Sequence, residues 1–390
     1  MRPKLPLILT IVAGLAACSD ASNPTRPALS AEAKFSVSSN AEVVPGRFII
    51  TVREGVSPSA VAAGHGVQPQ YLYTHALNGF AGAMSDAARD GLLRDARVTR
   101  VEPDGIAHAV TTQSDATWGL DRIDQGALPL SGTYTYTNTG SGVTAYIIDT
   151  GIEISHSDFG GRASVGYDAI GDGRNGIDCN GHGTHVSGTT GGTTWGVAKA
   201  VQLKAVRVLD CSGSGSWSGV IAGLDWVAAN RTIPAVGNMS LGGGASTSVD
   251  DAVKRTIASG VAMAVAAGNG NQGGRAQDAC KYSPARVAEA MTIGATDKTD
   301  TKTSWSNYGN CVDWFAPGLG ITSDWLNGGT NTISGTSMAT PHTTGVAALY
   351  LQSNPDATPA AVRDALFSNT SKGIVKSSKT VNNHLLFTNY

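Results

Sequence analysis

The sequence predicts an α/β protein in which a largely parallel central sheet carries helices on both faces, preceded by a small α+β domain. Two observations lead to this prediction. Apolar runs typical of buried strands alternate with helical segments from about residue 112 onward. Before that point, residues 45–110 show strand, helix and strand signals of their own.

The predicted parallel sheet rests on short runs that are largely apolar. Such runs are typical of strands buried on both faces. They include 143-VTAYIID-149, 203-LKAVRVL-209, 235-AVGNMSL-241 and 261-VAMAVAA-267, and the helical segments expected between such runs include residues 216–230 and 248–260. In such sheets ligands bind outside the carboxyl ends of the strands. Asp149 and Asn269 stand at two of those ends.

The smaller N-terminal domain is predicted from a separate set of signals. Strands are expected in 45-PGRFIITVREG-55, in 77-LNGFAGAM-84 and in 97-RVTRVEPDGIAHAV-110. A helix is expected in 85-SDAARDGLLRDA-96, which starts with the Ser and Asp residues that favour helix N-termini. We place this domain at residues 45–110 and the larger one at residues 111–390.

Composition excludes some classes of function. The chain has 390 residues, of which 41% are apolar and 15% charged, and its formal net charge is -2. This apolar content is enough to bury a sizeable core. Nucleic-acid binding is not expected, because the chain offers no basic surface.

The N-terminus has the layout of an export signal. A short basic start is followed by the apolar run of residues 5–17, which is too short to span a bilayer. The run ends in 15-LAAC-18, which resembles the bacterial lipobox, so a lipid on Cys18 stays open beside ordinary signal cleavage. We assign residues 1–18 to the signal and the polar residues 19–44 to a linker. The rest of the chain should lie outside the cytoplasm, with no stable membrane span.

Cysteine usage agrees with export. Besides Cys18 the chain contains Cys179, Cys211, Cys280 and Cys311. An even number of cysteines in an exported chain favours disulfides. Four cysteines allow three pairings, and the residues alone do not choose between them.

Three stretches supply the parts of an acyl-transfer site. They are 148-IDTGI-152, 180-NGHGTHVSGT-189 and 334-SGTSMATPH-342, and they offer Asp149, His182 and Ser337. A serine nucleophile needs an imidazole that accepts its proton and a buried carboxylate that holds the imidazole in one tautomer. Ser337 opens a predicted helix, whose backbone N–H groups can stabilise an oxyanion, and Asn269 offers a second donor.

These blocks, in the order Asp, His, Ser, resemble the subtilisin family of serine endopeptidases, with the greatest likeness to the proteinase K branch and its aqualysin-type bacterial members. The likeness runs from about residue 113 to the C-terminus. It includes the stretches 118-WGLDRID-124, 207-RVLDCSGSGS-216, 240-SLGG-243, 282-YSPARVAEA-290 and 304-SWSNYGNCVDWFAPG-318. The resemblance implies a subtilisin-like three-layer fold and a secreted, monomeric endopeptidase that uses no organic cofactor.

The resemblance also implies a role for each matching residue. Asp149 would orient His182, His182 would act as general base and acid, Ser337 would be the nucleophile, and Asn269 would complete the oxyanion hole. A polypeptide substrate would bind as an added strand between the segments 213–215 and 240–242. The pocket for the first side chain before the scissile bond would be walled by residues 240–243 and 266–268. These small, uncharged walls predict a preference for apolar or aromatic side chains. The implied substrate-binding residues are Gly213, Ser214, Gly215, Trp217, Ser240, Leu241, Gly242, Gly243, Ala266, Ala267 and Gly268.

The domain at residues 45–110 resembles the inhibitory propeptide of the same enzymes. The resemblance implies that this domain helps the catalytic domain to fold and occupies the cleft until it is cut. The cut would fall near residues 109–111. The protein would therefore be made as an autoprocessed zymogen with its own propeptide as an intramolecular inhibitor.

Two further features follow from the resemblance. Cys179 would pair with Cys211 and Cys280 with Cys311, and each closed loop should contribute on the order of 3 kcal/mol. Structural calcium would bind Asp313 with the backbone carbonyls of Ala288 and Ala290, since oxygen-only ligation suits calcium. A second site at Asp121, Asp124 and Gln125 should be weak or absent, because Ser131 and Thr133 stand where some relatives carry further ligands.

Several alternatives accompany these expectations. Cys179, His182 and His185 could hold zinc, but no fourth ligand is evident nearby. His185 and His342 are expected to be structural. A catalytically silent relative that serves as a binding or scaffold protein is the alternative function, although such a protein would be expected to lack a triad member. The pair Thr343 and Thr344 departs from the Val-Ala that relatives usually carry, which predicts a packing difference.

Overall fold

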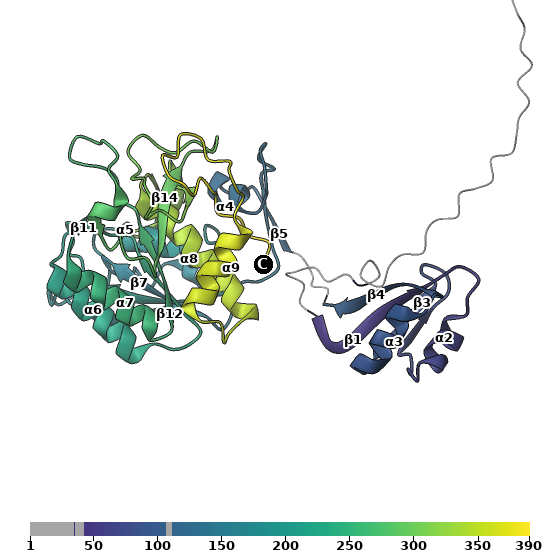
Figure 1. The fold of residues 1–390 in the computed structure, drawn as a ribbon. Coiled ribbons are helices and arrows are strands. Elements are labelled where there is room, and N and C mark those ends of the chain that lie inside the picture. The colour runs from purple at the N-terminus through teal and green to yellow at the C-terminus, as the bar shows by residue number, and fades with distance from the viewer. Residues whose placement is uncertain (1–34, 36–42, 107–110) are drawn as a thin grey trace, which may run out of the picture. The chain divides into compact units, whose positions relative to one another are not determined.

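The computed structural model describes residue 35 and residues 43–106 and 111–390. The chain divides into two compact units at residues 108 and 109 (Figure 1). The predicted export signal with Cys18, and most of the predicted linker, lie outside the described residues. No described helix is both long enough and apolar enough to cross a bilayer.

The smaller unit is a four-stranded antiparallel sheet with two helices, as far as its described residues show. The strands in spatial order are β2 (Tyr71–Tyr73), β3 (Gly79–Ala83), β1 (Val43–Val52) and β4 (Val98–Gly105), and the helices are α2 (Pro58–Gly64) and α3 (Asp86–Arg94). Buried side chains from both helices and three strands form one core, including Ile50, Phe80 and Leu92. The predicted α+β class is confirmed, while α2 and β2 are additions that the sequence analysis missed.

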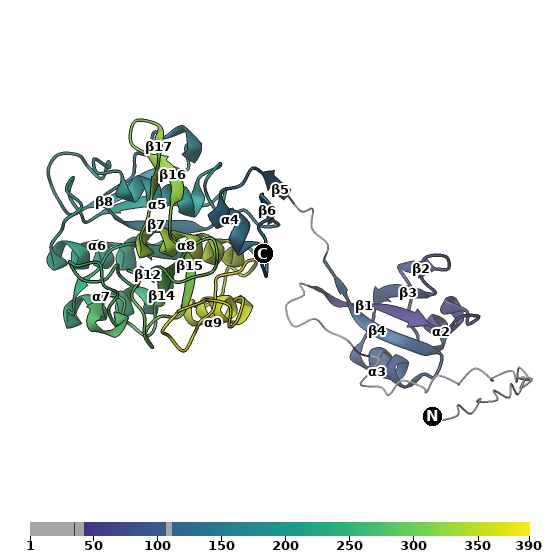
Figure 2. The same cartoon turned by 90° about the horizontal axis from the view of Figure 1, so that it is seen from above.

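The larger unit is built on a parallel sheet that has seven strands within the described residues (Figure 2). In spatial order they are β15 (Trp314–Pro317), β14 (Met291–Thr296), β12 (Val261–Ala266), β10 (Ala235–Met239), β7 (Thr144–Asp149), β9 (Gln202–Arg207) and β8 (Ala163–Asp168). Every residue of β7, β10, β12, β14 and β15 is buried. The apolar runs in the sequence therefore mark strands that are covered on both faces.

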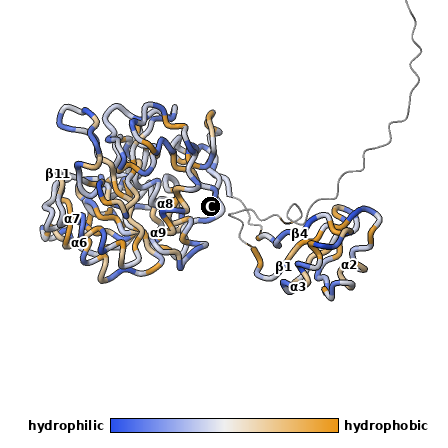
Figure 3. Tube along the Cα trace, viewed as in Figure 1, coloured by the Kyte–Doolittle hydropathy of each residue, from blue (hydrophilic) through white to orange (hydrophobic). Residues whose placement is uncertain are grey.

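Successive side chains of each strand pack on opposite faces of the sheet. Ala145 and Ile147 of β7 join the core that includes the helices α8 (Thr336–Ser353) and α9 (Pro359–Asn369). Tyr146 and Ile148 join the core formed with α6 (Trp217–Asn230) and α7 (Thr247–Ala258). In Figure 3 orange hydrophobic stretches run through the interior of this unit. The predicted three-layer α/β fold is confirmed.

The remaining elements surround this framework. They are α4 (Trp118–Ile123), α5 (His182–Gly191), the short helices η1 (Ser157–Phe159) and η2 (Ala279–Lys281), and the strand pairs β5 (Thr111–Ser114) with β6 (Thr133–Tyr136), β11 (Gly243–Gly244) with β13 (Tyr282–Ser283), and β16 (Ile321–Trp325) with β17 (Gly329–Ile333). α5 packs against both α8 and the β16 hairpin.

The helices that approach the predicted site differ from α6 and α7 in how their N-termini are capped. α6 and α7 begin after Ser216 and Ser246, whose hydroxyls accept hydrogen bonds from backbone N–H groups of the first turn. Such caps satisfy donors that a helix leaves unpaired. α5 and α8 instead begin after Gly181 and Gly335, which offer no side-chain cap. Their first turns are thus open to other partners.

Candidate active site

Asp149 and His182 meet at the carboxyl end of the sheet. Asp149 is the last residue of β7 and His182 the first residue of α5, and the Asp149 Oδ1 atom lies 2.7 Å from His182 Nδ1. The Asp149 side chain is fully buried, whereas the His182 side chain is 24% exposed. The Thr150 backbone N–H also donates to Asp149 Oδ1. The carboxylate therefore fixes the imidazole while the other edge of the ring stays accessible.

Asp178, which the sequence analysis missed, organises the start of α5. Its Oδ1 atom accepts hydrogen bonds from the Thr150 hydroxyl and from the backbone N–H groups of Asn180 and Gly181. Its Oδ2 atom accepts from both the backbone N–H and the hydroxyl of Thr184. One carboxylate thus joins the residue after Asp149 to the first turn of the His182 helix. A single aspartate in a loop carries no sequence signal for this role, because loop aspartates are common turn formers.

Electrostatics favour the protonated form of His182. Burial by itself lowers the pKa of His182, but the charge and hydrogen bond of Asp149 and the charge of Asp178 outweigh that effect. The pKa of His182 is therefore raised above its ordinary value. An imidazole in this setting can accept a proton and hold it as the imidazolium.

Ser337 lies in the first turn of α8, close to the strand end that carries Ser240. In this conformation the Ser337 hydroxyl donates to the Ser240 backbone oxygen at 3.0 Å. The Ser240 hydroxyl in turn donates to the Ser337 backbone oxygen at 2.8 Å. Ser337 and Ser240 are thus paired in both directions.

Asn269 and the first turn of α8 converge on the space beside Gly335. Asn269 Oδ1 accepts hydrogen bonds from the N–H and hydroxyl of Thr336, both at 2.8 Å, which aims its Nδ2 group away from them. A Cβ atom added to Gly335 would lie 3.3 Å from Asn269 Nδ2 and 3.5 Å from Ser337 N. Two nitrogen atoms that carry N–H groups therefore border one small volume, and an oxyanion site needs two such donors.

A cleft of about 560 Å³ adjoins His182. Its lining contains eight of the residues that the resemblance implies for substrate binding: Gly213, Ser214, Gly215, Trp217, Ser240, Leu241, Gly242 and Gly243. Thr150, Asn180, Leu209, Ser212, Val220 and Gly244 also line it. The two predicted segments therefore border one cavity together with His182.

Three predicted pocket residues lie elsewhere. Ala266 and Ala267 are buried at the end of β12, and neither they nor Gly268 lines the cleft described above. The Gly268 N–H donates to the Thr336 hydroxyl at 3.1 Å, so this segment contacts the start of α8. Their role as walls of the first specificity pocket stays a prediction.

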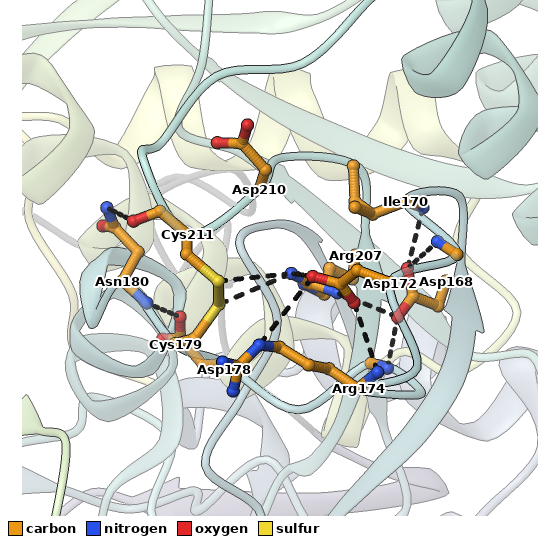
Figure 4. Close-up of polar contacts among 12 residues, drawn as sticks. Asp168, Ile170, Asp172, Arg174, Asp178, Cys179, Asn180, Arg207, Asp210 and Cys211 are labelled. Carbon is orange, nitrogen blue, oxygen red and sulfur yellow. Dashed lines mark hydrogen bonds and ion pairs between the residues drawn. A yellow bond between two sulfur atoms is a disulfide. The ribbon is translucent and has the colours of Figure 1, made fainter.

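The structure contains both disulfides that the resemblance implies, Cys179–Cys211 and Cys280–Cys311. The first joins the loop before α5 to the loop that carries Gly213, and the buried Arg207 lies against it (Figure 4). Arg207 forms ion pairs with Asp168 and Asp172. Because the Cys179 sulfur is bonded to Cys211, it is not a zinc ligand, and the zinc alternative fails.

The other two histidines of these motifs are buried. His185 Nε2 contacts the Ile321 backbone oxygen at 3.0 Å, and His342 Nδ1 contacts the Met338 backbone oxygen at 2.8 Å. Burial lowers the pKa of each ring to about 4. Both rings are therefore neutral at ordinary pH and make the structural contacts that the sequence analysis expects.

The predicted calcium ligand Asp313 already has two partners. Arg363 of α9 pairs with its Oδ1 atom, and the Thr292 N–H donates to its Oδ2 atom at 2.8 Å. Burial raises the pKa of Asp313, although Arg363 opposes this rise. In this arrangement the site does not fit a calcium ion that binds both carboxylate oxygens, because the guanidinium occupies one of them.

The weaker predicted calcium site is also hydrogen-bonded internally. Asp121 accepts hydrogen bonds from the N–H and hydroxyl of Ser131 and from the Gly132 N–H. Gln125 donates its amide N–H groups to backbone oxygens. Burial, with a smaller contribution from Asp121, raises the pKa of Asp124 to about 6. The expectation of a weak or absent site stays a prediction, and these contacts are its structural basis.

Comparison with known proteins identifies the family. The subtilase family, peptidase S8, matches residues 140–386, and the peptidase inhibitor I9 family matches residues 47–109. An extracellular serine proteinase of Thermus sp. (strain Rt41A) is 52% identical over 403 residues, which cover 95% of each chain. Proteinase T of Parengyodontium album is 51% identical over 257 residues, covering 64% of this chain and 85% of that protein.

A solved structure agrees with these sequence matches. The crystal structure of a cold adapted subtilisin-like serine proteinase shares 54% identity with this chain, with a TM-score of 0.68. It covers 70% of this chain, and 98% of its own length is matched. The chain therefore belongs to the subtilase family of serine peptidases and carries an inhibitor I9 domain ahead of its catalytic domain.

Proposed function

We propose that this protein is a secreted serine endopeptidase in which Asp149, His182 and Ser337 form the catalytic triad. The observation that carries the proposal is the 2.7 Å contact between the buried Asp149 carboxylate and His182, at the edge of a cleft. A catalytically silent scaffold protein would not need this pairing. Side chains and backbone supply every group of the proposed reaction, so no organic cofactor enters it.

The reaction would begin with proton transfer from Ser337. Its hydroxyl leaves the Ser240 backbone oxygen and turns toward His182 Nε2, which accepts the proton while the oxygen attacks the substrate carbonyl. Asp149 stabilises the imidazolium, and Asn269 Nδ2 with the Ser337 N–H stabilises the oxyanion. His182 then returns the proton to the leaving amine. Water hydrolyses the acyl-enzyme by the same route.

Substrate recognition would depend mainly on the peptide backbone. The segments 213–215 and 240–242 border the cleft and can accept an extended chain as an added strand. Trp217 both lines the cleft and packs on the core between the sheet and α6. We propose broad specificity with apolar or aromatic side chains preferred before the scissile bond, since no charged side chain lines the cleft apart from His182 in the described residues.

Activation would require removal of the I9 domain. The match to this inhibitor family ends at residue 109, and the catalytic unit starts with β5 at Thr111. We therefore place the processing cut near residues 109–111, which is where the sequence analysis expects it. The Thermus relative, which is named an extracellular serine proteinase, supports export through the N-terminal segment. We further propose that the mature enzyme is a monomer.

We propose a structural calcium ion only if the contact between Arg363 and Asp313 rearranges. An ion held by Asp313, Ala288 and Ala290 would have to displace Arg363 from the carboxylate. Chelation should then lower the Tm of the wild-type protein but not that of Asp313→Asn. An unchanged Tm of the wild type after chelation, measured by calorimetry, would remove calcium from the proposal.

The central test is Ser337→Ala, with Ser353→Ala on the same helix as the control. Ser337→Ala should lose casein hydrolysis and accumulate as the unprocessed precursor, while Ser353→Ala should be processed and active. Intact mass and N-terminal sequencing of the exported protein give the processing site and the state of Cys18. A wild-type protein that neither hydrolyses peptides nor reacts with a serine-directed fluorophosphonate would refute the proposal and favour the scaffold alternative.

A further inference from the structure

Thr343 and Thr344 are adjacent on α8, and both side chains are buried, yet their hydroxyls have different partners. The Thr343 hydroxyl accepts a hydrogen bond from Trp314 Nε1 at 3.1 Å. The Thr344 hydroxyl donates to Asn238 Oδ1 at 2.9 Å, with the Thr340 backbone oxygen farther away at 3.3 Å. The departure noted in the sequence is therefore a pair of buried polar contacts, and one of them leads toward the active site.

The Thr344 contact is the first link of a chain of hydrogen bonds. Asn238 Nδ2 donates to Ser240 Oγ at 2.9 Å, and Ser240 Oγ donates to the Ser337 backbone oxygen at 2.8 Å. Asn238 and Thr344 are fully buried and Ser240 is 3% exposed. Each donor points in the same direction, from the middle of α8 toward the proposed nucleophile.

The last hydrogen bond of this series, from the Ser240 hydroxyl to the Ser337 backbone oxygen, replaces one that the helix cannot make. In an α-helix the backbone oxygen of Ser337 would accept from the N–H of residue 341. That residue is Pro341, which lies inside α8 and has no N–H. The Ser337 carbonyl is partly buried, and a carbonyl without a donor is costly there, so the Ser240 hydroxyl takes the place of the missing N–H.

The donor-to-acceptor direction of this series of hydrogen bonds depends on Thr344. Ser240 can donate its single proton to Ser337 because its oxygen accepts from the Asn238 amide N–H. That arrangement requires the Asn238 oxygen to point the other way, toward a donor, and Thr344 is that donor. If the amide were reversed, the Asn238 oxygen would compete for the Ser240 proton and the Ser337 carbonyl would lose its partner.

We infer that Asn238 and Thr344 are positioning residues for Ser337. They hold the Ser240 hydroxyl on the Ser337 carbonyl, and this contact fixes the first turn of α8 against the substrate-binding segment 240–242. The inference rests on the proposed function of Ser337 as nucleophile. It adds two residues that touch neither substrate nor reacting atoms and act through Ser240.

The test compares Thr344→Val with Thr343→Val. Both changes remove a hydroxyl from a buried position of α8 and keep the shape of the side chain, but only Thr344 is linked to Ser240. Thr344→Val should lower kcat about tenfold, with KM changed less than about twofold, because the defect lies in the placement of the nucleophile. Thr343→Val should keep the wild-type kcat. Thr344→Ser, which retains the hydroxyl, should restore kcat.

The rate of inactivation by a serine-directed fluorophosphonate gives a second readout. It should fall in parallel with kcat in Thr344→Val and stay unchanged in Thr343→Val, even where both variants have a lower Tm. If Thr344→Val loses stability but retains kcat and fluorophosphonate reactivity, the residue is only structural and the inference is wrong. If the wild-type protein itself is inert, the proposed function fails instead, so the two failures are distinguishable.

Discussion

Asp324 is a buried carboxyl group whose protonation should control stability. It lies on β16 and is fully buried, and neither of its oxygens receives a hydrogen bond from a donor in the described part of the chain. Its polar neighbour is the Asp158 carboxylate, which itself accepts from the Thr194 N–H. His156 Nδ1 lies 3.5 Å from Asp324 Oδ1, but this nitrogen accepts a hydrogen bond from the Asp158 N–H. Nothing described here compensates a negative charge on Asp324 directly.

The C-terminal end of α5 lies close to the carboxyl groups of Asp324 and Asp158. Cβ atoms added to Gly188 and Gly192 would lie 2.7 and 3.1 Å from Asp324 Oδ2. Helix C-termini carry partial negative charge, which disfavours a second ionised carboxylate beside Asp158. Burial, followed by the charge and hydrogen bond of Asp158, raises the pKa of Asp324 to about 8, against a smaller opposing effect of Arg162.

The sign of the pH effect follows from this raised pKa. Between about pH 4 and pH 8 the folded protein keeps a proton on Asp324 that the unfolded chain has lost, so stability falls as pH rises through this window. From pH 5 to pH 8, at about 1.4 kcal/mol per unit, the loss is about 4 kcal/mol. Because the Asp158 carboxyl group interacts with Asp324, we expect a loss of about 2–4 kcal/mol.

Asp324→Asn removes the titrating group and can donate its amide to Asp158. Both proteins are first inhibited with a fluorophosphonate to prevent self-digestion, and their Tm values are measured by calorimetry from pH 5 to pH 9. The Tm of the variant minus that of the wild type should be about 5–10 °C larger at pH 8 than at pH 5. Asp251→Asn, an exposed aspartate on α7, is the control and should track the wild type. An equal Tm difference at pH 5 and pH 8 for Asp324→Asn would refute the reasoning.

Three further predictions concern the active site. Asn269→Ala should lower kcat about 10²- to 10³-fold in peptide hydrolysis with little change in KM, and a wild-type kcat would exclude Asn269 from the oxyanion site. Gly335→Ala should lower kcat in the same assay, because its methyl group would fill the space between Asn269 Nδ2 and Ser337 N; undiminished turnover would show that the oxyanion binds elsewhere. Asp178→Asn should move the acid limb of the kcat/KM profile to lower pH, since the Asp178 charge helps to raise the pKa of His182. An unshifted limb would show that Asp178 only supports the loop.

Sequence patterns predicted the larger unit well because its strands are buried on both faces. The run at residues 143–149 corresponds to β7 at Thr144–Asp149, and the run at residues 261–267 corresponds to β12 at Val261–Ala266. The helices at residues 216–230 and 248–260 are likewise found as α6 and α7, within two residues at each end. A strand covered on both faces buries most of its side chains among apolar neighbours, so it carries a nearly continuous apolar run and the pattern is strong.

The two elements that the sequence analysis missed in the smaller unit are short. α2 has seven residues, and β2 has three, two of which are exposed. A helix of two turns or a strand of three residues shows too few periods to stand out from a loop. The boundaries of the domains, and the roles of the site residues in catalysis, stay predictions.

The sequence by itself determined the fold class, the family and the identity of the residues that carry the proposed chemistry, because buried strands and short motifs are local in the chain. Only the tertiary structure decided which polar groups pair. Asp178 joins the residue after β7 to α5, and Asn238 and Ser240 contact Thr344 and Ser337 of α8 from a segment about a hundred residues earlier in the chain. A buried hydroxyl or amide must find a partner wherever the fold brings one, and no local pattern records that partner.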